Sequence, residues 1–308
     1  MTPTDSEAPR KVDESCTVDT LSLAMAGETV KVDTKYGPIT VTVCGDAKKP
    51  ALLTCHDIGL NHRSCFQGLF MCAGPESRLL KNFCVYHIDL PGHEENATEV
   101  PAELLPVTVD KLSDMVDKVM KHFEISECMG LGVGYGAYVL TKYATTFPGM
   151  VGLIAVTPLY NKPGWHEWGN LKAATYQLWY GGLSNWVREY IISRLVHNGM
   201  MNQASDLTQA YRKDLSARPP RVLMHYLQAA MTRSGLQAAS LKSQVLMFVG
   251  DKSPFKEESL DMNTSIASHG ALVLIDGAGT VTTEERPQEM INPIDLFLQR
   301  LEQQGFGV

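Results

Sequence analysis

The chain has 308 residues, of which 44% are hydrophobic and 20% charged, and its formal net charge is −7. These values are typical of a globular protein with a sizeable core. No cluster of Lys and Arg indicates a nucleic-acid-binding face, no apolar run is long enough to span a bilayer, and the polar N-terminus lacks the apolar segment of a signal peptide. We therefore expect a cytoplasmic protein with no nucleic-acid partner and no integral membrane association.

The chain contains seven cysteines, which is an odd number, and no two of them have Cys-x-x-Cys spacing. Disulfide and zinc frameworks use regular close spacings, and several of these cysteines lie within apolar runs. We therefore expect reduced structural thiols, no metal site and no cofactor.

The first half of the chain alternates short apolar runs with helical patterns, after a polar segment at residues 1–18 that we expect to be a disordered leader. Predicted strands span residues 28–33, 39–44, 50–56, 82–89, 128–133 and 151–157. Helical patterns occur at residues 77–80, 109–123 and 137–146. This alternation with short connections predicts a mostly parallel sheet that is covered by helices on both faces.

Residues 160–238 break this alternation, because they contain all four tryptophans and helical patterns with no strand between them. Strand patterns return at residues 244–249 and 271–275, before a closing helix at residues 287–301. This organisation predicts a core in two parts, residues 19–159 and 239–308, with a helical cap inserted at residues 160–238.

A glycine-rich turn between a predicted strand and a predicted helix resembles the nucleophile elbow Gly-x-Ser-x-Gly of α/β-hydrolases. The flanking glycines are Gly132 and Gly136, but the central residue is Gly134, which has no side chain. Glycine tolerates the positive φ of an elbow without the strain that a serine bears. The predicted fold is therefore an α/β-hydrolase fold without its nucleophile, with a mostly parallel central sheet flanked by helices and an inserted helical cap.

The other two positions of a catalytic triad also carry unsuitable residues. The triad acid normally lies three residues after a glycine that follows the next-to-last strand, and Ser253 stands there after Gly250. Asp251 lies two residues too early and could replace the acid only if the loop shifted. The triad histidine normally follows a glycine after the last strand, where this chain has Thr280. Because a hydroxyl group is no general base for a serine proton, we do not expect catalysis by the usual route.

The loop after the third predicted strand retains the position of an oxyanion hole. The residues concerned are His56, Asp57, Ile58, Gly59 and, from the elbow, Tyr135. In a hydrolase, backbone N–H groups of this loop and of the elbow would hold the oxyanion. We favour loop-fixing hydrogen bonds as the role of the His56 and Asp57 side chains. The alternative is a vestigial pocket that holds a small anion or carbonyl group.

Trp165 and Trp168 stand at positions i and i+3 of the predicted cap. Such a pair more often packs a cap onto its core, and this is the interpretation that we favour. The alternative is an anchor for a partner protein, because aromatic residues are enriched at interaction hot spots.

Several motifs, in the same order, resemble those of the N-myc downstream-regulated (NDRG) family. They are residues 56–62 (HDIGLNH), 65–70 (CFQGLF), 132–140 (GVGYGAYVL), 164–168 (GWHEW), 249–255 (VGDKSPF) and 282–287 (TTEERP). The motif at residues 65–70 and the segments 82–88 and 91–94 resemble the plant branch of that family. The resemblance covers roughly residues 28–300.

The resemblance implies a non-catalytic α/β-hydrolase fold in the cytoplasm that acts through protein partners in signal transduction, stress response or development. For the plant branch it implies a link to heterotrimeric G-protein components. The family lacks the triad, and the corresponding positions here are Gly134, Ser253 and Thr280.

Three hypotheses follow for the function. The first is a non-enzymatic adaptor that binds signalling proteins. The second is a small-molecule sensor that uses the vestigial pocket, and the third is an atypical residual hydrolase in which Asp57, His56 or Asp251 acts on water.

Overall fold

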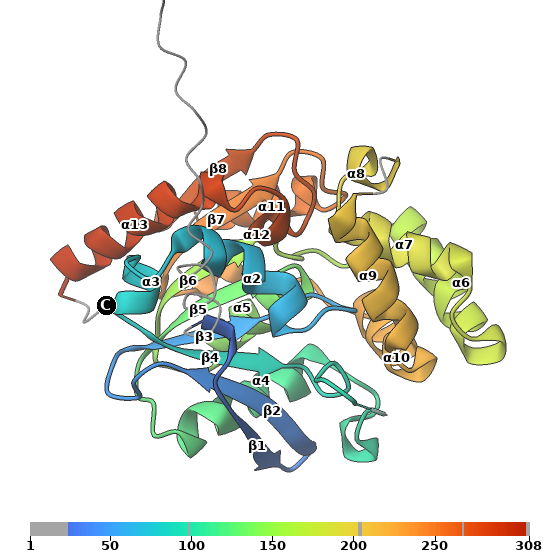
Figure 1. Cartoon of the computed structure of the whole chain (residues 1–308), viewed down its shortest axis with the longest axis horizontal. Helices are drawn as coiled ribbons and strands as arrows, with labels where there is room; N and C mark the ends of the chain where they lie inside the picture. Colours follow the sequence, from blue (N-terminus) through green and yellow to red (C-terminus); the bar gives the residue numbers. More distant parts are fainter. Residues whose placement is uncertain (1–23, 98, 203–204, 267, 306–308) are drawn as a thin grey trace, which may run out of the picture.

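One eight-stranded sheet forms the centre of the computed structural model, which describes residues 24–97, 99–202, 205–266 and 268–305. The strands are β1 (Glu28–Thr34), β2 (Gly37–Cys44), β3 (Ala51–Cys55), β4 (Cys84–Asp89), β5 (Cys128–Val133), β6 (Met150–Val156), β7 (Gln244–Gly250) and β8 (Gly270–Ile275). Their order across the sheet is β1-β2-β4-β3-β5-β6-β7-β8 (Figure 1). The predicted leader at residues 1–18 lies outside the described residues.

The pairing of the strands is mostly parallel, as predicted. β1 and β2 form an antiparallel hairpin and β2 pairs antiparallel with β4, whereas the remaining neighbours pair in parallel. Every residue of β3, β4 and β5 is buried. A strand that is covered on both faces has no solvent side, so its sequence is a continuous apolar run rather than an alternation.

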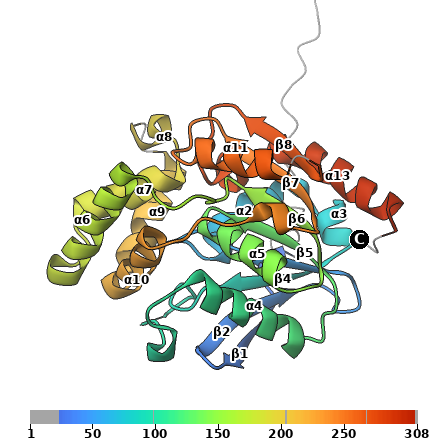
Figure 2. The same cartoon turned by 180° about the vertical axis from the view of Figure 1, so that it is seen from behind.

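Helices cover both faces of the sheet. One face carries α2 (His62–Ala73), α3 (Arg78–Lys81), α12 (Thr282–Glu285) and α13 (Gln288–Gln303), and the other carries α4 (Val109–His122), α5 (Tyr135–Thr146) and α11 (Lys256–Ser265) (Figures 1 and 2). The short 3₁₀ helices are η1 (Ala102–Leu104) and η2 (Ala238–Ser240). The predicted arrangement of a sheet between two helical layers is thus confirmed.

The helices between β6 and β7 lie together beside the sheet (Figure 1). They are α6 (Trp165–Gly181), α7 (Asn185–Leu195), α8 (Asn198–Asn202), α9 (Asp206–Ala217) and α10 (Pro220–Met231). Arg218 donates hydrogen bonds to the backbone carbonyls of Gly59 and His93, both at 2.8 Å. Tyr226 donates to the carbonyl of Pro91 at 2.9 Å. These bonds hold the cap over the loops that follow the carboxyl ends of β3 and β4.

Besides the four-residue helix α12, two longer helices of the core were not predicted from the sequence. α2 begins with a capping box, in which Asn61 and Ser64 each accept a hydrogen bond from the other's backbone N–H at 3.0 Å. α11 is largely polar, and only Ser259 and Met262 of its residues are buried. A helix with so few buried apolar residues lacks the periodicity on which prediction depends.

The six cysteines in the described part of the chain are unpaired, and all but Cys72 are buried. Burial raises the pKa of the Cys44 thiol to about 11. These thiols therefore stay protonated near neutral pH and pack as small apolar side chains. Among the described helices, none is long and apolar enough to cross a membrane.

Candidate functional site

The turn between β5 and α5 has the geometry of a nucleophile elbow. Gly134 has φ +53° and ψ −114°, and it is the N-cap residue of α5. Its N–H donates to the carbonyl of Val156 on the neighbouring strand at 2.9 Å. A Cβ atom on Gly136 would overlap the backbone carbonyl of Cys55, so the helix can approach β3 this closely only because residue 136 is a glycine.

The side chain of Asp57 fills the space that a nucleophile would occupy. A Cβ atom built on Gly134 would overlap the carboxylate carbon and Oδ2 of Asp57. Asp57 itself is buried at the end of β3, although it lies far from the elbow in the sequence. The missing side chain at position 134 has therefore not left a cavity beside the elbow.

The Asp57 carboxylate also accepts hydrogen bonds from both backbone N–H groups that would form the expected oxyanion hole. Its Oδ1 atom accepts the backbone N–H of Ile58 at 2.7 Å and that of Tyr135 at 2.9 Å. Burial raises the pKa of this carboxyl, while the two N–H donors and the charge of Arg194 act to lower it. A carboxylate oxygen of the protein thus stands where the oxyanion of a substrate would bind in a hydrolase.

The two remaining triad positions form a hydroxyl pair. Ser253 Oγ and Thr280 Oγ1 lie 2.8 Å apart, and both residues are buried. Ser253 Oγ also accepts the N–H of Phe255 at 3.1 Å. The pair therefore reproduces the contact between a triad acid and its histidine, but neither hydroxyl can act as a general base or carry a negative charge near neutral pH.

Asp251 does not replace the missing acid. Its Oδ1 atom accepts the N–H of Gly277 at 2.7 Å, and its Oδ2 atom contacts Lys252 Nζ at 2.7 Å. The Lys252 hydrogen bond lowers the pKa of Asp251. The carboxylate therefore links the turns after β7 and β8, and the loop shift that a catalytic role would require has not occurred.

His56 holds its loop in place with both ring nitrogens. Its Nδ1–H donates to the carbonyl of Asp57 at 2.8 Å, and its Nε2 atom accepts the N–H of Leu90 at 3.0 Å. Burial lowers the pKa of His56 to about 4, so the ring is neutral near pH 7. The backbone N–H of Gly59, which has φ +85°, donates to His93 Nε2 at 3.1 Å, so a second histidine ring accepts a hydrogen bond from the backbone here. The loop-fixing interpretation of His56 agrees with these contacts.

The cap closes over the hydroxyl pair. The backbone carbonyl of Leu195, at the end of α7, accepts the N–H groups of Thr280 and Val281, both at 2.9 Å. Two residues later, His197 Nδ1 lies 2.6 Å from Glu285 Oε2 in α12. These contacts seal the former general-base position beneath the cap.

A buried ion-pair network joins the cap to the core. The guanidinium of Arg233 donates to both carboxylate oxygens of Glu167 at 2.8 Å and contacts Glu258 Oε1 of α11 at 3.1 Å. Arg194 on α7 adds a second cation at 3.0 Å from Glu167 Oε1. Although burial acts to raise the pKa of Glu167, the hydrogen bonds and charges of the two arginines hold it below the usual value.

Beside this network a cleft of about 660 Å³ opens between the cap and the core. Its walls include Tyr190 and Arg194 of α7 and Phe255. The Arg194 guanidinium lies 4.6 Å from the centre of the Phe255 ring. Because Phe255 stands two residues after Ser253, this cleft is a candidate ligand site next to the former catalytic centre.

Trp165 does not pack the cap onto the core, because 86% of its surface is exposed. Trp168 is 36% exposed, and its ring lies edge-on to that of Trp165 with the centroids 6.1 Å apart. The packing interpretation is therefore wrong for Trp165. The spacing i, i+3 correctly places both residues on one helix face, but it does not reveal that the face points to solvent.

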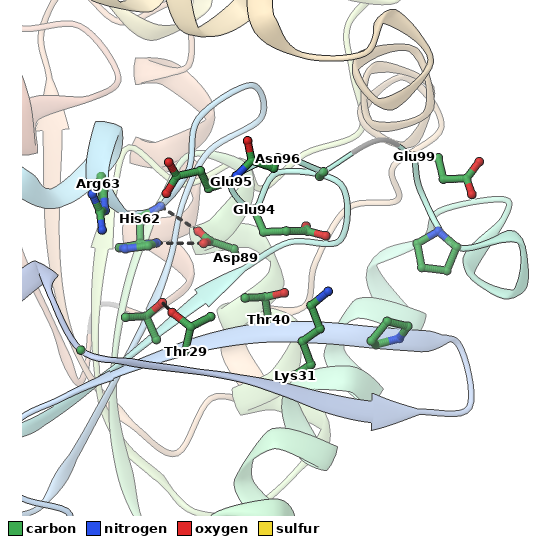
Figure 3. A pocket seen from close by; sticks show the side chains of 15 residues that line it. Thr29, Lys31, Thr40, His62, Arg63, Asp89, Glu94, Glu95, Asn96 and Glu99 are labelled. Carbon is green, nitrogen blue, oxygen red and sulfur yellow. Dashed lines mark hydrogen bonds and ion pairs between the residues drawn. The ribbon is translucent and has the colours of Figure 1, made fainter.

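A second hollow, of about 450 Å³, was not anticipated from the sequence. It lies between the β1–β2 hairpin, the start of α2 and the segments 94–97 and 99–101 (Figure 3). Asp89 accepts two hydrogen bonds from His62 there, from Nδ1 and from the backbone N–H, both at 2.8 Å. The Nε2 atom of His62 is shielded from solvent, so this pair ties α2 to β4 rather than presenting a base to the hollow. Within the described ranges no group of His, Cys, Asp and Glu could hold a metal ion.

Comparison with known proteins gives both a family and a fold. Residues 29–308 match the model of the Ndr family. The chain is 38% identical to "Protein NDL1" of Arabidopsis thaliana over 300 residues, which cover 94% of this chain and 85% of that protein. It is 32% identical to "Protein NDRG2" of Bos taurus over 284 residues, which cover 88% of this chain and 77% of that protein.

The similar solved structures are α/β-hydrolases of low sequence identity. A thermophilic esterase from Thermogutta terrifontis has a TM-score of 0.74 at 19% identity, over 89% of this chain and 99% of the esterase. An enol-lactonase from Burkholderia xenovorans has a TM-score of 0.74 at 14% identity, over 88% of this chain and 100% of the lactonase. At these identities the likeness shows the α/β-hydrolase fold, as predicted, and does not extend to activity.

Proposed function

The chain belongs to the Ndr family, and on that premise we propose that it is a non-enzymatic adaptor, acting in the cytoplasm through protein partners in signal transduction, stress response or development. Membership of the family, which the sequence motifs predicted, supports a signalling or developmental role of a non-catalytic type in general. The adaptor role and its partners are the specific content of the proposal.

The observation that carries the proposal is the position of the Asp57 carboxylate. It occupies the volume of a nucleophile on Gly134 and accepts the two N–H groups that would bind an oxyanion. Transition-state stabilisation at such a site depends on free, preorganised donors. A site whose donors are already bonded to a protein carboxylate, and whose acid and base positions are Ser253 and Thr280, is unsuited to acyl transfer.

The absence of hydrolysis is tested with fluorophosphonate probes and a panel of activated esters, with an active esterase as the positive control. We expect neither labelling of the purified chain nor turnover above that of buffer. The matched variant is Asp57→Asn, which retains the shape of the side chain and an acceptor oxygen but removes the charge. Turnover that copurifies with the wild-type chain and is abolished by Asp57→Asn or His56→Gln would refute the proposal.

The partners we propose include heterotrimeric G-protein components, which the resemblance to the plant branch implies. The test is direct titration of the purified chain with purified G-protein subunits, monitored by calorimetry. Saturable binding supports this part of the proposal. Absence of heat at concentrations well above the micromolar range removes these subunits as direct partners and leaves the adaptor role to be tested with other signalling proteins.

A second candidate function is a small-molecule sensor, which the cleft of about 660 Å³ between cap and core favours. A ligand that binds only the folded state raises the melting temperature. Thermal-shift screening against lipids and hormone-like ligands tests this candidate, with Arg194→Gln as the variant that should weaken the shift. If no compound in a broad panel raises the melting temperature, the sensor hypothesis fails.

A further inference from the structure

The outer face of α6 is an aromatic ridge, formed by Trp165, Trp168, Tyr176, Trp179 and Tyr180. Their exposed fractions are 86%, 36%, 66%, 58% and 72%, respectively. At about 100° per residue, these five positions and that of Lys172 fall within an arc of about 120° on the helix surface and extend over about 22 Å along the helix. The helix stands at the edge of the molecule in both views (Figures 1 and 2).

The opposite face of α6 already provides the packing that holds the helix in the cap. Its buried residues are Leu171, Ala174 and Leu178. A surface helix normally presents polar residues on the side away from the core, whereas α6 is apolar or aromatic on both sides. The aromatic ridge is therefore not needed to pack the cap. Exposed aromatic surface of this extent marks a binding surface.

The charges beside the aromatic ridge are positive. Lys172 Nζ lies 4.7 Å from the centre of the Trp168 ring, and the Arg221 guanidinium lies 5.6 Å from the centre of the Trp179 ring. Neither cation forms an ion pair with a residue that the structure describes. Residues 168–188 and the whole of α10, which packs against α6, contain no Asp or Glu. The chain as a whole has a net charge of −7, so this face has the opposite sign to the molecule.

An apolar hollow continues the aromatic ridge at the N-terminal end of α6. Its volume is about 510 Å³, and it is lined by Lys162, Pro163, Gly164, Trp165 and Trp168. Four of these residues offer carbon surface and the fifth offers an ammonium group. A hydrocarbon segment attached to an anionic group matches that lining.

We propose that the aromatic ridge docks the cap onto the surface of a bilayer that carries anionic phospholipids. Trp and Tyr are the residues that concentrate at membrane–water interfaces, because each has an apolar ring and a polar tip. Lys172 and Arg221 then face the lipid phosphates, and α6 lies in the plane of the interface.

A protein partner is the competing occupant, since Trp and Tyr also form hot spots between proteins. Such hot spots cluster at the centre of a patch and insert into pockets of the partner. Here the rings are instead spread along a helix at the edge of the molecule, with the cations of Lys172 and Arg221 beside them. The spacing and the charges therefore favour a lipid surface. The inference is independent of whether the elbow site is catalytic.

The test is co-sedimentation of the full chain with vesicles of phosphatidylcholine and phosphatidylserine in roughly 7:3 proportion, compared with phosphatidylcholine alone. We expect the wild-type chain to sediment with the anionic vesicles, and less of it with the neutral ones. The double variant Trp165→Ala, Trp179→Ala should bind anionic vesicles at least about tenfold more weakly. The double variant Lys172→Glu, Arg221→Glu should lose the preference for anionic vesicles.

The matched control is Leu296→Ala. Leu296 is a large apolar residue that is 66% exposed on α13, at the other end of the molecule from α6 (Figure 1). This variant should bind like the wild type. Melting temperatures verify that the ridge variants remain folded, and Tyr176→Ser with Tyr180→Ser provides a second pair if the first does not fold.

Three results would overturn the proposal. The first is a wild-type chain that does not bind anionic vesicles. The second is a folded ridge variant that binds them as tightly as the wild type. The third is a Leu296→Ala control that loses binding to the same extent as the ridge variants. If a purified protein partner instead shows binding that depends on Trp165 and Trp179 while vesicles do not, the aromatic ridge is a protein interface.

Discussion

At the scale of the residue, Asp57 links the loss of the nucleophile to the loss of the oxyanion hole. Its carboxylate requires the space that a side chain at position 134 would need, and in that space it accepts the N–H groups of Ile58 and Tyr135. The two changes stabilise each other, because the glycine makes room for the carboxylate and the carboxylate satisfies donors that would otherwise be buried without partners. A single reversion at position 134 therefore does not rebuild a nucleophile.

The first prediction concerns Gly134→Ser. We expect the variant to lose about 2–4 kcal/mol of unfolding free energy, because the new side chain would overlap Asp57 and residue 134 has a positive φ. The double variant with Asp57→Gly should lose less unfolding free energy than the sum of the two single losses, because the overlap disappears once the carboxylate is removed. The measurement is urea unfolding of the wild type, both single variants and the double variant.

Strictly additive losses in this cycle would show that Asp57 and the elbow do not compete for space. The folded double variant should still not hydrolyse activated esters. Thr280 and Ser253 remain unable to activate a new serine, so the cycle separates restored packing from restored chemistry.

The second prediction concerns the response of stability to acid. Burial lowers the pKa of His56 from 6.5 to about 4, so the unfolded chain takes up this proton first as the pH falls. The neutral ring contributes to the free energy of unfolding in full above about pH 6.5. This contribution is lost as the pH falls through about 4, and the total loss is roughly 3 kcal/mol. The difference in unfolding free energy between the wild type and His56→Gln should therefore shrink over that range. A difference that is constant from pH 7 to pH 4 would contradict the neutral, buried assignment of His56.

At the scale of the element, the cap and the core are joined by charge as well as by packing. Arg233 follows α10, Glu167 is in α6, Arg194 is in α7 and Glu258 is in α11. Burial raises the pKa of Glu258 against the opposing charge of Arg233. Removing the central cation would leave Glu258 without an ion-pair partner and Glu167 with Arg194 as its one remaining cation among the described residues.

The third prediction follows from this arrangement. Arg233→Met should cost roughly 3 kcal/mol or more of unfolding free energy, because it leaves the buried Glu258 without an ion-pair partner and removes the bidentate partner of Glu167. The matched control is Arg212→Met, since Arg212 pairs with Glu189 at 2.8 Å between α9 and α7 in a half-exposed setting. That change should cost less than about 1 kcal/mol. Denaturant unfolding of both variants tests the contrast, and similar small losses would show that the buried network is not what fastens the cap.

The elements that were predicted correctly are those with strong local patterns. α4 was expected at residues 109–123 and spans Val109–His122, because its apolar residues recur at helical spacing behind the N-cap Thr108. α2 was missed because its buried residues include His62 and two bulky phenylalanines around Gly68, which do not suggest a helix individually. α11 was missed because it packs through only two of its residues. The local sequence pattern therefore predicts a helix only where many of its apolar residues are buried and recur at helical spacing.

At the scale of the whole molecule, the positions of the site residues follow from the order of the strands, but their side-chain contacts do not. Gly134, Ser253 and Thr280 could be placed because each follows a predicted strand at a fixed spacing. The bond between Asp57 and the N–H of Tyr135 joins residues 78 positions apart, across two neighbouring parallel strands. No local pattern encodes such a contact. The exposure of Trp165 has the same origin, since it depends on which face of α6 meets α10.

The placement of the tryptophans also has a spectroscopic consequence. All four lie between residues 165 and 186, in α6 and α7. Tryptophan fluorescence, excited at a wavelength that tyrosine does not absorb, therefore reports on the cap alone, whereas far-ultraviolet circular dichroism averages over the sheet and all its helices. We expect the two signals to follow one unfolding transition in the wild type, because Arg233 couples the cap to the core. In Arg233→Met the fluorescence midpoint should precede the dichroism midpoint, so the protein carries a built-in reporter for the detachment of its cap.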